Sequence, residues 1–216
     1  MFTPEAQETI YNLRNASINH YPFPHFYIQN VFPKPLYRFL RNSLPPSGEY
    51  STKGTSYHGR QFAEPTTPLL DFMRTEEFAI HICSIFLPQI LKRRKETETP
   101  SKITHELRFV RDREKYQIGP HTDTPRKLVS LLFYLPPDAF MQDLGTSISL
   151  HNDPKFYCNS GTHHPFDNFT KIYTAPFLPN SCFGFFRTSQ SFHGVSPITI
   201  PCKRDVLLYN LYDAAI

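Results

Sequence analysis

The sequence predicts a mainly β protein with flanking helices, and three observations support this class. From Ile103 onward, short apolar segments separated by turn residues recur at intervals typical of strands in a sandwich or barrel. Before that point, apolar side chains fall at helical spacing instead. The length of 216 residues suits a single domain with a sizeable core. We therefore expect one integrated domain, in which residues 1–102 form a helical support with N-terminal strands and residues 103–216 form a β core.

The N-terminal half is predicted to alternate helices with extended segments. The expected elements are, in order, a helix over residues 4–15, a short strand within 21–32, a helix over 34–44, a loop over 45–68 and a helix over 76–94. Pro4 suits the first position of a helix. Leu36, Phe39 and Leu40 share one face of the second helix. Pro88 is expected to kink the third helix.

The C-terminal half is predicted to be a succession of strands. A charged, apolar-poor run at residues 92–102 indicates a solvated boundary between the two halves. The expected strands cover residues 103–112, 127–135, 146–152, 171–176, 181–187 and 205–213. The second of these is a nearly continuous apolar run, as expected of a strand covered on both faces. Residues 153–170 are polar and rich in His, Pro and Asn, which predicts a long loop.

Composition argues against several classes of protein. The net charge of +4 is too small to indicate nucleic-acid binding and slightly favours small anionic molecules. No apolar run approaches the length of about 18 residues that a membrane span needs, and the N-terminus lacks the apolar region of a signal peptide. The four cysteines are scattered, which fits reduced thiols. We therefore expect a cytoplasmic protein with no membrane or nucleic-acid partner, either a monomer or a homodimer.

Two strong metal-binding side chains, His121 and Asp123, precede the apolar run at residues 127–135. Residues two apart on an extended backbone share a face, so we expect both side chains to point into whatever that face encloses. A buried carboxylate without a partner is costly, and a bound cation would remove that cost. Two ligands rarely hold a catalytic metal alone, so a third ligand is expected elsewhere in the chain.

His193 is the third ligand that the sequence favours among 10 histidines. The adjacent His163 and His164 would diverge on an extended backbone, and His151 ends a predicted strand without further signal. His193 lies between two predicted strands and precedes a turn-prone glycine. Two imidazoles and one carboxylate on one face of an octahedron leave the other positions open, as in non-haem Fe(II) oxygenases. An ordinary hydrogen-bonded or exposed histidine is the alternative at His121 and at His193.

Arg204 strengthens the interpretation as an oxygenase. Oxygen activation at such an iron requires two further electrons, usually from 2-oxoglutarate, which chelates the metal through its keto oxygen and adjacent carboxylate. The far carboxylate then needs a fixed cation, and the planar guanidinium of an arginine pairs with it bidentately. Arg204 opens the last apolar strand, where an unpaired charge would be costly. A turn residue beside Lys203 is the alternative interpretation.

Taken together, the HTD segment at residues 121–123, the SFHGVSP segment around His193 and Arg204 resemble the Fe(II)- and 2-oxoglutarate-dependent dioxygenases. The match is closest to the branch related to prolyl hydroxylases and covers about residues 103–213. The resemblance implies a double-stranded β-helix, or jelly roll, as the catalytic core over residues 103–216. It also implies that His121, Asp123 and His193 are the metal ligands and catalytic residues, and that Arg204 binds 2-oxoglutarate.

The resemblance extends to cofactors, reaction and one further residue. Tyr134 occupies the position of a tyrosine that, in prolyl hydroxylases, donates its hydroxyl to the far carboxylate of 2-oxoglutarate; a core tyrosine is the alternative. The implied cofactors are Fe(II) with the co-substrates 2-oxoglutarate and O2, and ascorbate is a further candidate. The implied reaction hydroxylates a C–H bond of an amino acid, a peptidyl residue or a small metabolite, and releases succinate and CO2. Tyr116 and Lys127 are candidate substrate-binding residues, with a surface tyrosine as the alternative for Tyr116.

Three other functions are left open by the sequence. A non-catalytic jelly-roll module could bind a metal or another ligand, although the complete ligand set with Arg204 favours an enzyme. A zinc hydrolase would use the same three ligands, but Arg204 would then have no evident function. Nucleic-acid repair enzymes of this class carry a second arginine on the same strand, at the position that Asn210 occupies here. The sequence holds no signal that selects one substrate.

Overall fold

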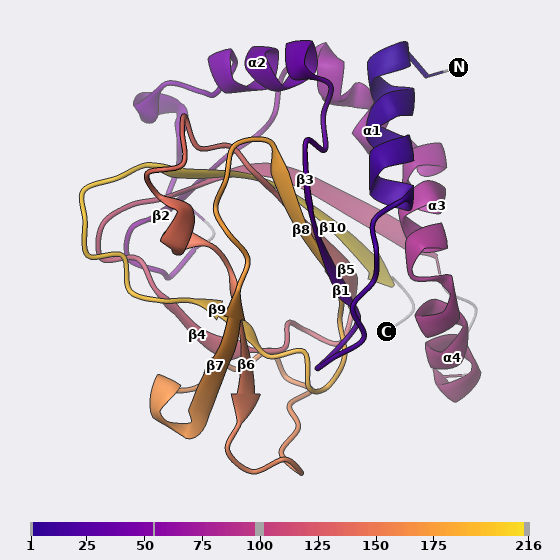
Figure 1. The fold of residues 1–216 in the computed structure, drawn as a ribbon, viewed down its shortest axis with the longest axis vertical. Coiled ribbons are helices and arrows are strands. Elements are labelled where there is room, and N and C mark those ends of the chain that lie inside the picture. Colours follow the sequence, from indigo (N-terminus) through magenta and orange to yellow (C-terminus); the bar gives the residue numbers. More distant parts are fainter. Residues whose placement is uncertain (1, 54, 98–101, 214–216) are drawn as a thin grey trace.

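Two antiparallel β-sheets, with helices on the outer side of the larger one, form the fold (Figure 1). The computed structural model describes residues 2–53, 55–97 and 102–213. Within these ranges, helices dominate the first half of the chain and strands the second half. The predicted class, mainly β with flanking helices, is confirmed.

Four α-helices lie in the described part of the chain. They are α1 (Pro4–Arg14), α2 (Lys34–Asn42), α3 (Glu76–Ile85) and α4 (Leu87–Thr97). Short 3₁₀ segments cover Ser47–Glu49, Pro68–Arg74, Gln142–Leu144 and Phe166–Asn168. Thr3 and Thr75 cap α1 and α3, because each hydroxyl accepts a hydrogen bond from a backbone N–H in the first turn. The helices predicted over residues 4–15 and 34–44 are thereby confirmed.

The single helix predicted over residues 76–94 is wrong as one continuous element. α3 ends at Ile85 and α4 begins at Leu87, so Phe86 separates two helices. Pro88 lies in the first turn of α4, where a missing N–H breaks no hydrogen bond of the helix. The proline therefore begins a new helix and does not kink an existing one. α4 extends into the charged run at residues 92–102, of which residues 98–101 lie outside the described residues.

The major sheet has six strands in the order β1-β8-β5-β10-β3-β2. Their bounds are β1 (His25–Gln29), β8 (Ser181–Phe186), β5 (Lys127–Tyr134), β10 (Arg204–Asp213), β3 (Ile103–Asp112) and β2 (Arg60–Ala63). β10 pairs with β3 on one side and β5 on the other. The two strands from the N-terminal half, β1 and β2, form the edges of this sheet. The support and the β core thus share one sheet.

The expectation of a loop throughout residues 45–68 is wrong at β2. The four residues of β2 are polar at Arg60 and Gln61 and show no apolar alternation, so pattern reading does not find a strand there. The strand forms because its backbone pairs with the edge of β3, with Arg60 opposite Asp112. Pairing with β3 has therefore outweighed the weak intrinsic preference of these residues for a strand.

The minor sheet has four strands in the order β4-β9-β6-β7. Their bounds are β4 (Ile118–His121), β9 (His193–Val195), β6 (Ser147–His151) and β7 (Phe169–Thr174). β4 and β9 are too short for the sequence pattern to have predicted them, yet they carry two of the candidate ligands. β7 begins inside the predicted 153–170 loop, at Phe169.

Alternate residues of the central strand β10 face two different environments. Leu207, Tyr209 and Leu211 belong to the apolar cluster that also includes residues of α1, α3 and α4, the helices that cover the outer face of the sheet (Figure 1). Arg204 and Val206 instead line a cavity on the inner face. The helices therefore bury one face of the major sheet and leave the other to face the minor sheet, which is where the site lies.

Candidate metal centre and its cavity

His121, Asp123 and His193 lie together at one end of the space between the sheets. His121 is the last residue of β4 and His193 the first residue of β9, and the two are directly paired across these strands. Nε2 of His121 lies 3.7 Å from Oδ1 of Asp123, and Nε2 of His193 lies 3.6 Å from Oδ2. One ligand atom from each residue falls within 4.8 Å of the other two. Three nitrogen and oxygen atoms at these separations can contact one metal ion.

The backbone at Asp123 corrects the reason for which His121 and Asp123 were expected to converge. β4 ends at His121, and Asp123 takes a left-handed conformation with φ 59°. The pair therefore does not share the face of a strand. The chain turns sharply after His121, and this turn brings the carboxylate back towards both imidazoles. Aspartate is among the residues that tolerate this conformation best, and strained backbone of this kind clusters at functional sites.

Both imidazoles are held with Nε2 available to a metal. Nδ1 of His121 lies 3.0 Å from the Gly119 carbonyl, and Nδ1 of His193 lies 2.9 Å from the Ser191 carbonyl. A carbonyl only accepts hydrogen bonds, so Nδ1 carries the proton and Nε2 presents a lone pair. This arrangement is typical of histidines that ligate metals. Two neutral imidazoles and one carboxylate fit a first-row divalent metal such as Fe(II).

Electrostatics keep the three ligands in the form that binds a metal. Burial and the neighbouring His193 lower the pKa of His121 to about 3. Burial also lowers the pKa of His193, against the opposing effect of Asp123. Burial alone would raise the pKa of Asp123, but the positive charge of Lys127 beside the carboxylate is the main influence that lowers it below its usual value. At neutral pH the site therefore holds two neutral imidazoles and one carboxylate.

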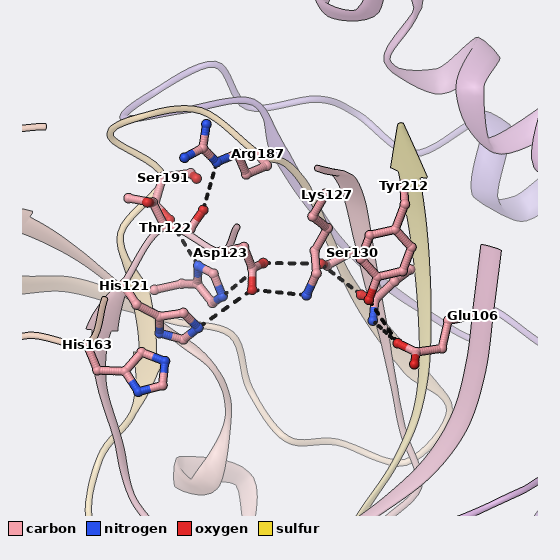
Figure 2. Close-up of polar contacts among 12 residues, drawn as sticks. Glu106, His121, Thr122, Asp123, Lys127, Ser130, His163, Arg187, Ser191 and Tyr212 are labelled. Carbon is pink, nitrogen blue, oxygen red and sulfur yellow. Dashed lines mark hydrogen bonds and ion pairs between the residues drawn. The ribbon is translucent and has the colours of Figure 1, made fainter. Parts of the chain in front are cut away.

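Lys127 and Ser130 of β5 reach Asp123 from the opposite side to the histidines (Figure 2). The Lys127 ammonium lies 3.0 Å from Oδ1, and the Ser130 hydroxyl lies 3.4 Å from Oδ2. Ser130 also donates to the side-chain oxygen of Asn210, whose amide donates to Glu106. The structure thus places the candidate Lys127 inside the cavity, in contact with a metal ligand. Asn210 is engaged within the protein.

Hydrogen bonds from Thr122 and to it hold the segment between His121 and Asp123 in place. The Thr122 carbonyl accepts a hydrogen bond of 3.0 Å from Nε of Arg187, as Figure 2 shows. The Thr122 hydroxyl donates to the Cys158 carbonyl at 2.7 Å. Thr122 and Arg187 are both buried. These contacts hold the sharp turn that positions Asp123.

A cavity of about 90 Å³ runs from the three ligands into the space between the sheets. Because a water needs about 10–15 Å³ by this kind of measure, the cavity can hold a small molecule in place of several waters. Its inner end is lined by Arg204 and Arg60, and both contact Asp112. Arg204, Asp112 and Arg60 form one row across the major sheet, because Asp112 is the direct partner of both arginines. The cavity therefore has a metal-binding end and a cationic end.

The two candidate tyrosines occupy different positions. Tyr116 is fully buried, so the surface alternative is wrong, and its side chain lines the cavity. Tyr134 is also fully buried but is not among the lining residues. Its hydroxyl accepts a hydrogen bond from the Thr146 backbone N–H at 3.0 Å, and its ring centre lies 5.7 Å from the Arg204 guanidinium carbon.

Sequence reasoning missed four residues that shape the site. Arg60 and Asp112 could not be identified from the sequence, because the pairing of β2 with β3 that brings them together exists only in the folded protein. His163, rated a poor chelator, is outside the ligand group, but its ring centre lies 4.4 Å from that of His121 (Figure 2). Tyr57 places its hydroxyl 2.7 Å from Nδ1 of His163. The only signal in the sequence for any of these residues was the pair of adjacent histidines, His163 and His164, in the 153–170 loop.

Comparisons with known proteins extend to structure alone. No family model matches the sequence, and no curated protein matches it. Solved structures do match. A prolyl hydroxylase from Trichoplax adhaerens, in complex with a peptide fragment of hypoxia inducible factor, is 15% identical, with a TM-score of 0.52 over 96% of this chain and 89% of that one.

Two further solved structures, of SnoN and HygX, match over similar lengths. The non-haem, alpha ketoglutarate-dependent epimerase SnoN from nogalamycin biosynthesis is 12% identical, with a TM-score of 0.55 over 97% of this chain and 81% of that one. HygX from Streptomyces hygroscopicus, solved with nickel, 2-oxoglutarate and hygromycin B, is 11% identical, with a TM-score of 0.51 over 99% and 88%.

These likenesses establish the fold. The chain is a jelly roll of the kind found in 2-oxoglutarate-dependent non-haem enzymes, and the expectation of a double-stranded β-helix is confirmed. Its candidate site lies inside that jelly roll, between the two sheets. Among the described helices, none combines the length and the hydrophobicity that crossing a bilayer requires.

Proposed function

We propose that this protein is an Fe(II)- and 2-oxoglutarate-dependent dioxygenase that hydroxylates a C–H bond of an amino acid, a peptidyl residue or a small metabolite. One observation carries the proposal. Two imidazoles and a carboxylate converge at one end of a jelly-roll cavity whose other end presents a buried arginine. That pairing of a metal-binding end with a cationic end suits a co-substrate that chelates through one terminus and carries a carboxylate at the other.

Each residue of the site has a separate role in the proposed reaction. His121, Asp123 and His193 hold the metal, and Arg204 holds the far carboxylate of 2-oxoglutarate. When bound, Fe(II) supplies the redox chemistry by which O2 and 2-oxoglutarate yield succinate, CO2 and a hydroxylated substrate. Tyr134 is the second donor that the family resemblance assigns to the far carboxylate. Ascorbate is a candidate reductant that would keep the metal ferrous.

The remaining residues orient the ligands and restrict access to the site. Lys127 fixes one oxygen of Asp123, and the Gly119 and Ser191 carbonyls fix the two imidazoles. His163 and Tyr57 form a wall beside His121. Lys127 and Tyr116 are proposed to contact bound molecules, because both line the cavity.

The substrate class stays broad in this proposal. The structural neighbours include a prolyl hydroxylase in complex with a peptide fragment and HygX with hygromycin B bound. One neighbour is an epimerase, so oxidation outcomes other than hydroxylation occur on this fold.

We propose a cytoplasmic monomer or homodimer without nucleic-acid or membrane partners. All four cysteines are free thiols, which supports a reducing location.

Two alternatives are weaker on structural grounds. A zinc hydrolase could use the same three ligands, but it would not need the two arginines, Arg60 and Arg204, that line the cavity. A non-catalytic module that binds only another ligand would not need histidines whose Nε2 atoms are freed by hydrogen bonds at Nδ1, and one that binds only a metal would not need Arg204 in the cavity. An assay for succinate formed from 2-oxoglutarate distinguishes both alternatives from a dioxygenase.

The test measures succinate formed from 2-oxoglutarate with Fe(II) and O2, with and without candidate substrates. His121→Ala and Asp123→Ala should each abolish the reaction, because two ligands do not retain the metal. His20→Ala is the matched control, since His20 is exposed and belongs neither to the group of three candidate ligands nor to the residues that line the cavity. Normal turnover by either ligand variant would show that the metal site is misassigned.

A further inference from the structure

The hydroxyl of Tyr116 is a buried polar group without a partner. The side chain is fully buried, and its hydroxyl has no hydrogen-bond partner among the residues that the structure describes. Burial raises the pKa of this hydroxyl, so it stays protonated and can donate. Leaving such a group unpaired is costly, so an unpaired donor that lines a cavity is unusual unless a bound ligand accepts its hydrogen bond.

The arginines beside Tyr116 leave one positive charge uncompensated. Arg60 donates to both oxygens of Asp112, at 2.7 and 2.9 Å, and Arg204 donates to one of them at 2.7 Å. Two guanidinium charges against one carboxylate leave a net charge of one. Arg204 and Asp112 are almost completely buried, so water screens this charge poorly.

The unpaired Tyr116 hydroxyl and the uncompensated positive charge lie at the same end of the cavity. The guanidinium carbon of Arg60 is 4.3 Å from the ring centre of Tyr116, and the charges of both arginines act on the Tyr116 hydroxyl. Arg204 uses three of its five N–H groups within the described structure, on Leu144, Asp112 and Thr146. One singly charged carboxylate would match the excess charge and accept from both Tyr116 and Arg204.

We infer that Tyr116 and Arg204 together bind the far carboxylate of the co-substrate, and that Arg60 makes this end of the cavity cationic by neutralising Asp112. The inference rests on the proposed function; it puts Tyr116 in place of Tyr134 as the second donor to the far carboxylate and adds Arg60 as a positioning residue. Arg60 comes from the N-terminal support, so β2 would contribute to a site that otherwise belongs to the β core.

Tyr134 is the competing donor, and the structure distinguishes the two tyrosines. The Tyr134 hydroxyl already accepts from the Thr146 N–H and does not line the cavity. Removing it would leave that N–H without its buried acceptor. Removing the Tyr116 hydroxyl leaves no protein group unpaired. Tyr134→Phe should therefore lower the stability of the protein more than Tyr116→Phe does, and Tyr116→Phe should weaken binding of 2-oxoglutarate more.

The first experiment measures binding of 2-oxoglutarate to the Mn(II)-loaded protein by calorimetry, where no turnover occurs. Tyr116→Phe should weaken binding by about 10- to 100-fold, because it removes one hydrogen bond to a charged group. Its affinity for Mn(II) and for 2-oxobutyrate, which lacks the far carboxylate, should match the wild type. Its melting temperature should not fall. Tyr134→Phe should melt at a lower temperature and lose less affinity for 2-oxoglutarate.

The second experiment tests the charge argument for Arg60. Arg60→Met should weaken 2-oxoglutarate binding by about 10-fold or more, because Asp112 then cancels the charge of Arg204. Adding Asp112→Asn to that variant restores the net positive charge and should recover part of the affinity. A purely structural role for Arg60 predicts no recovery from the second substitution.

The outcomes separate the two proposals. If the wild-type protein binds Mn(II) but not 2-oxoglutarate, the proposed function fails and this inference fails with it. If the wild type binds 2-oxoglutarate and Tyr116→Phe binds equally well, only the inference is overturned. A larger loss in Tyr134→Phe than in Tyr116→Phe would also overturn it and return the role to Tyr134. Failure of Asp112→Asn to rescue Arg60→Met would overturn the part assigned to Arg60.

Discussion

Asp123 shows how a single backbone conformation can bring together the residues of a candidate metal site. Its φ of 59° turns the chain just beyond β4, and the carboxylate then lies between two imidazoles and the Lys127 ammonium. An extended residue at this position would continue β4 and carry the carboxylate away from His193. The conformation of Asp123 is therefore as important to the site as its charge.

Substitutions at Asp123 should separate the two contributions. Asp123→Gly and Asp123→Ala both remove the carboxylate and should both lose metal binding. Asp123→Gly should nevertheless be more stable than Asp123→Ala by about 1 kcal/mol, since alanine is strained in the left-handed region and glycine is not. Urea unfolding in the presence of a chelator measures this difference. Equal stability would mean that the turn relaxes when the carboxylate is absent.

The candidate ligands could be chosen from the sequence because their chemistry is rare in combination. An imidazole and a carboxylate ahead of an apolar run, a distant histidine before a glycine and an arginine opening the last strand together indicate one kind of site. Arg60 and Asp112 could not be chosen in this way. Each is an ordinary charged residue in the sequence, and only strand register shows that Asp112 lies opposite both Arg60 and Arg204.

At the scale of elements, the short pair β4 and β9 carries two of the three ligands. Ile118 pairs with Val195 and His121 with His193, with an irregularity in register between them. Gly194 makes this close pairing possible. A Cβ built on Gly194 would lie 2.5 Å from the Ile118 carbonyl oxygen, which belongs to the backbone of β4 and cannot move without the strand.

Gly194→Ala should therefore separate β9 from β4 and weaken the metal site without touching a ligand. We expect a loss of about 1–3 kcal/mol in the free energy of unfolding, from the overpacked contact, together with weaker Mn(II) binding. Gly48→Ala is the matched control, because a Cβ there meets nothing within 4 Å. That variant should stay within about 0.5 kcal/mol of the wild type. Normal Mn(II) affinity in Gly194→Ala would show that the strands tolerate the methyl group.

Helices and strands with a clear apolar pattern in their own sequence could be predicted. Short strands that form only by pairing with a neighbouring strand could not. α1 and α2 have proline near the start and a regular apolar face, and β3, β5, β8 and β10 have strong apolar patterns. β2, β4 and β9 have three or four residues each and form because a neighbouring strand supplies their hydrogen bonds. The elements hardest to predict are thus those that complete the site.

At the scale of the molecule, the helical half and the strand half form one structure. Helices bury the outer face of the major sheet, β1 and β2 extend its edges, and the inner face encloses the cavity. The jelly roll could be expected from the family resemblance, and the structural neighbours confirm it. The participation of residues 1–102 in the sheet and the cavity needed the three-dimensional structure, because the resemblance covered only about residues 103–213.

Metal binding should stabilise the whole molecule, since the ligands come from β4, the turn beyond it and β9, and the folded state alone brings them together. Mn(II) at about 100 times its dissociation constant should add about 2.7 kcal/mol to the free energy of unfolding. For a chain of this size, that corresponds to a rise in melting temperature of about 5–10 °C. A chelator should reverse the rise, and His193→Ala should abolish it, whereas His20→Ala should retain it. A rise that persists in His193→Ala would place the bound ion somewhere other than between these strands, and the absence of any rise in the wild type would contradict the metal site itself.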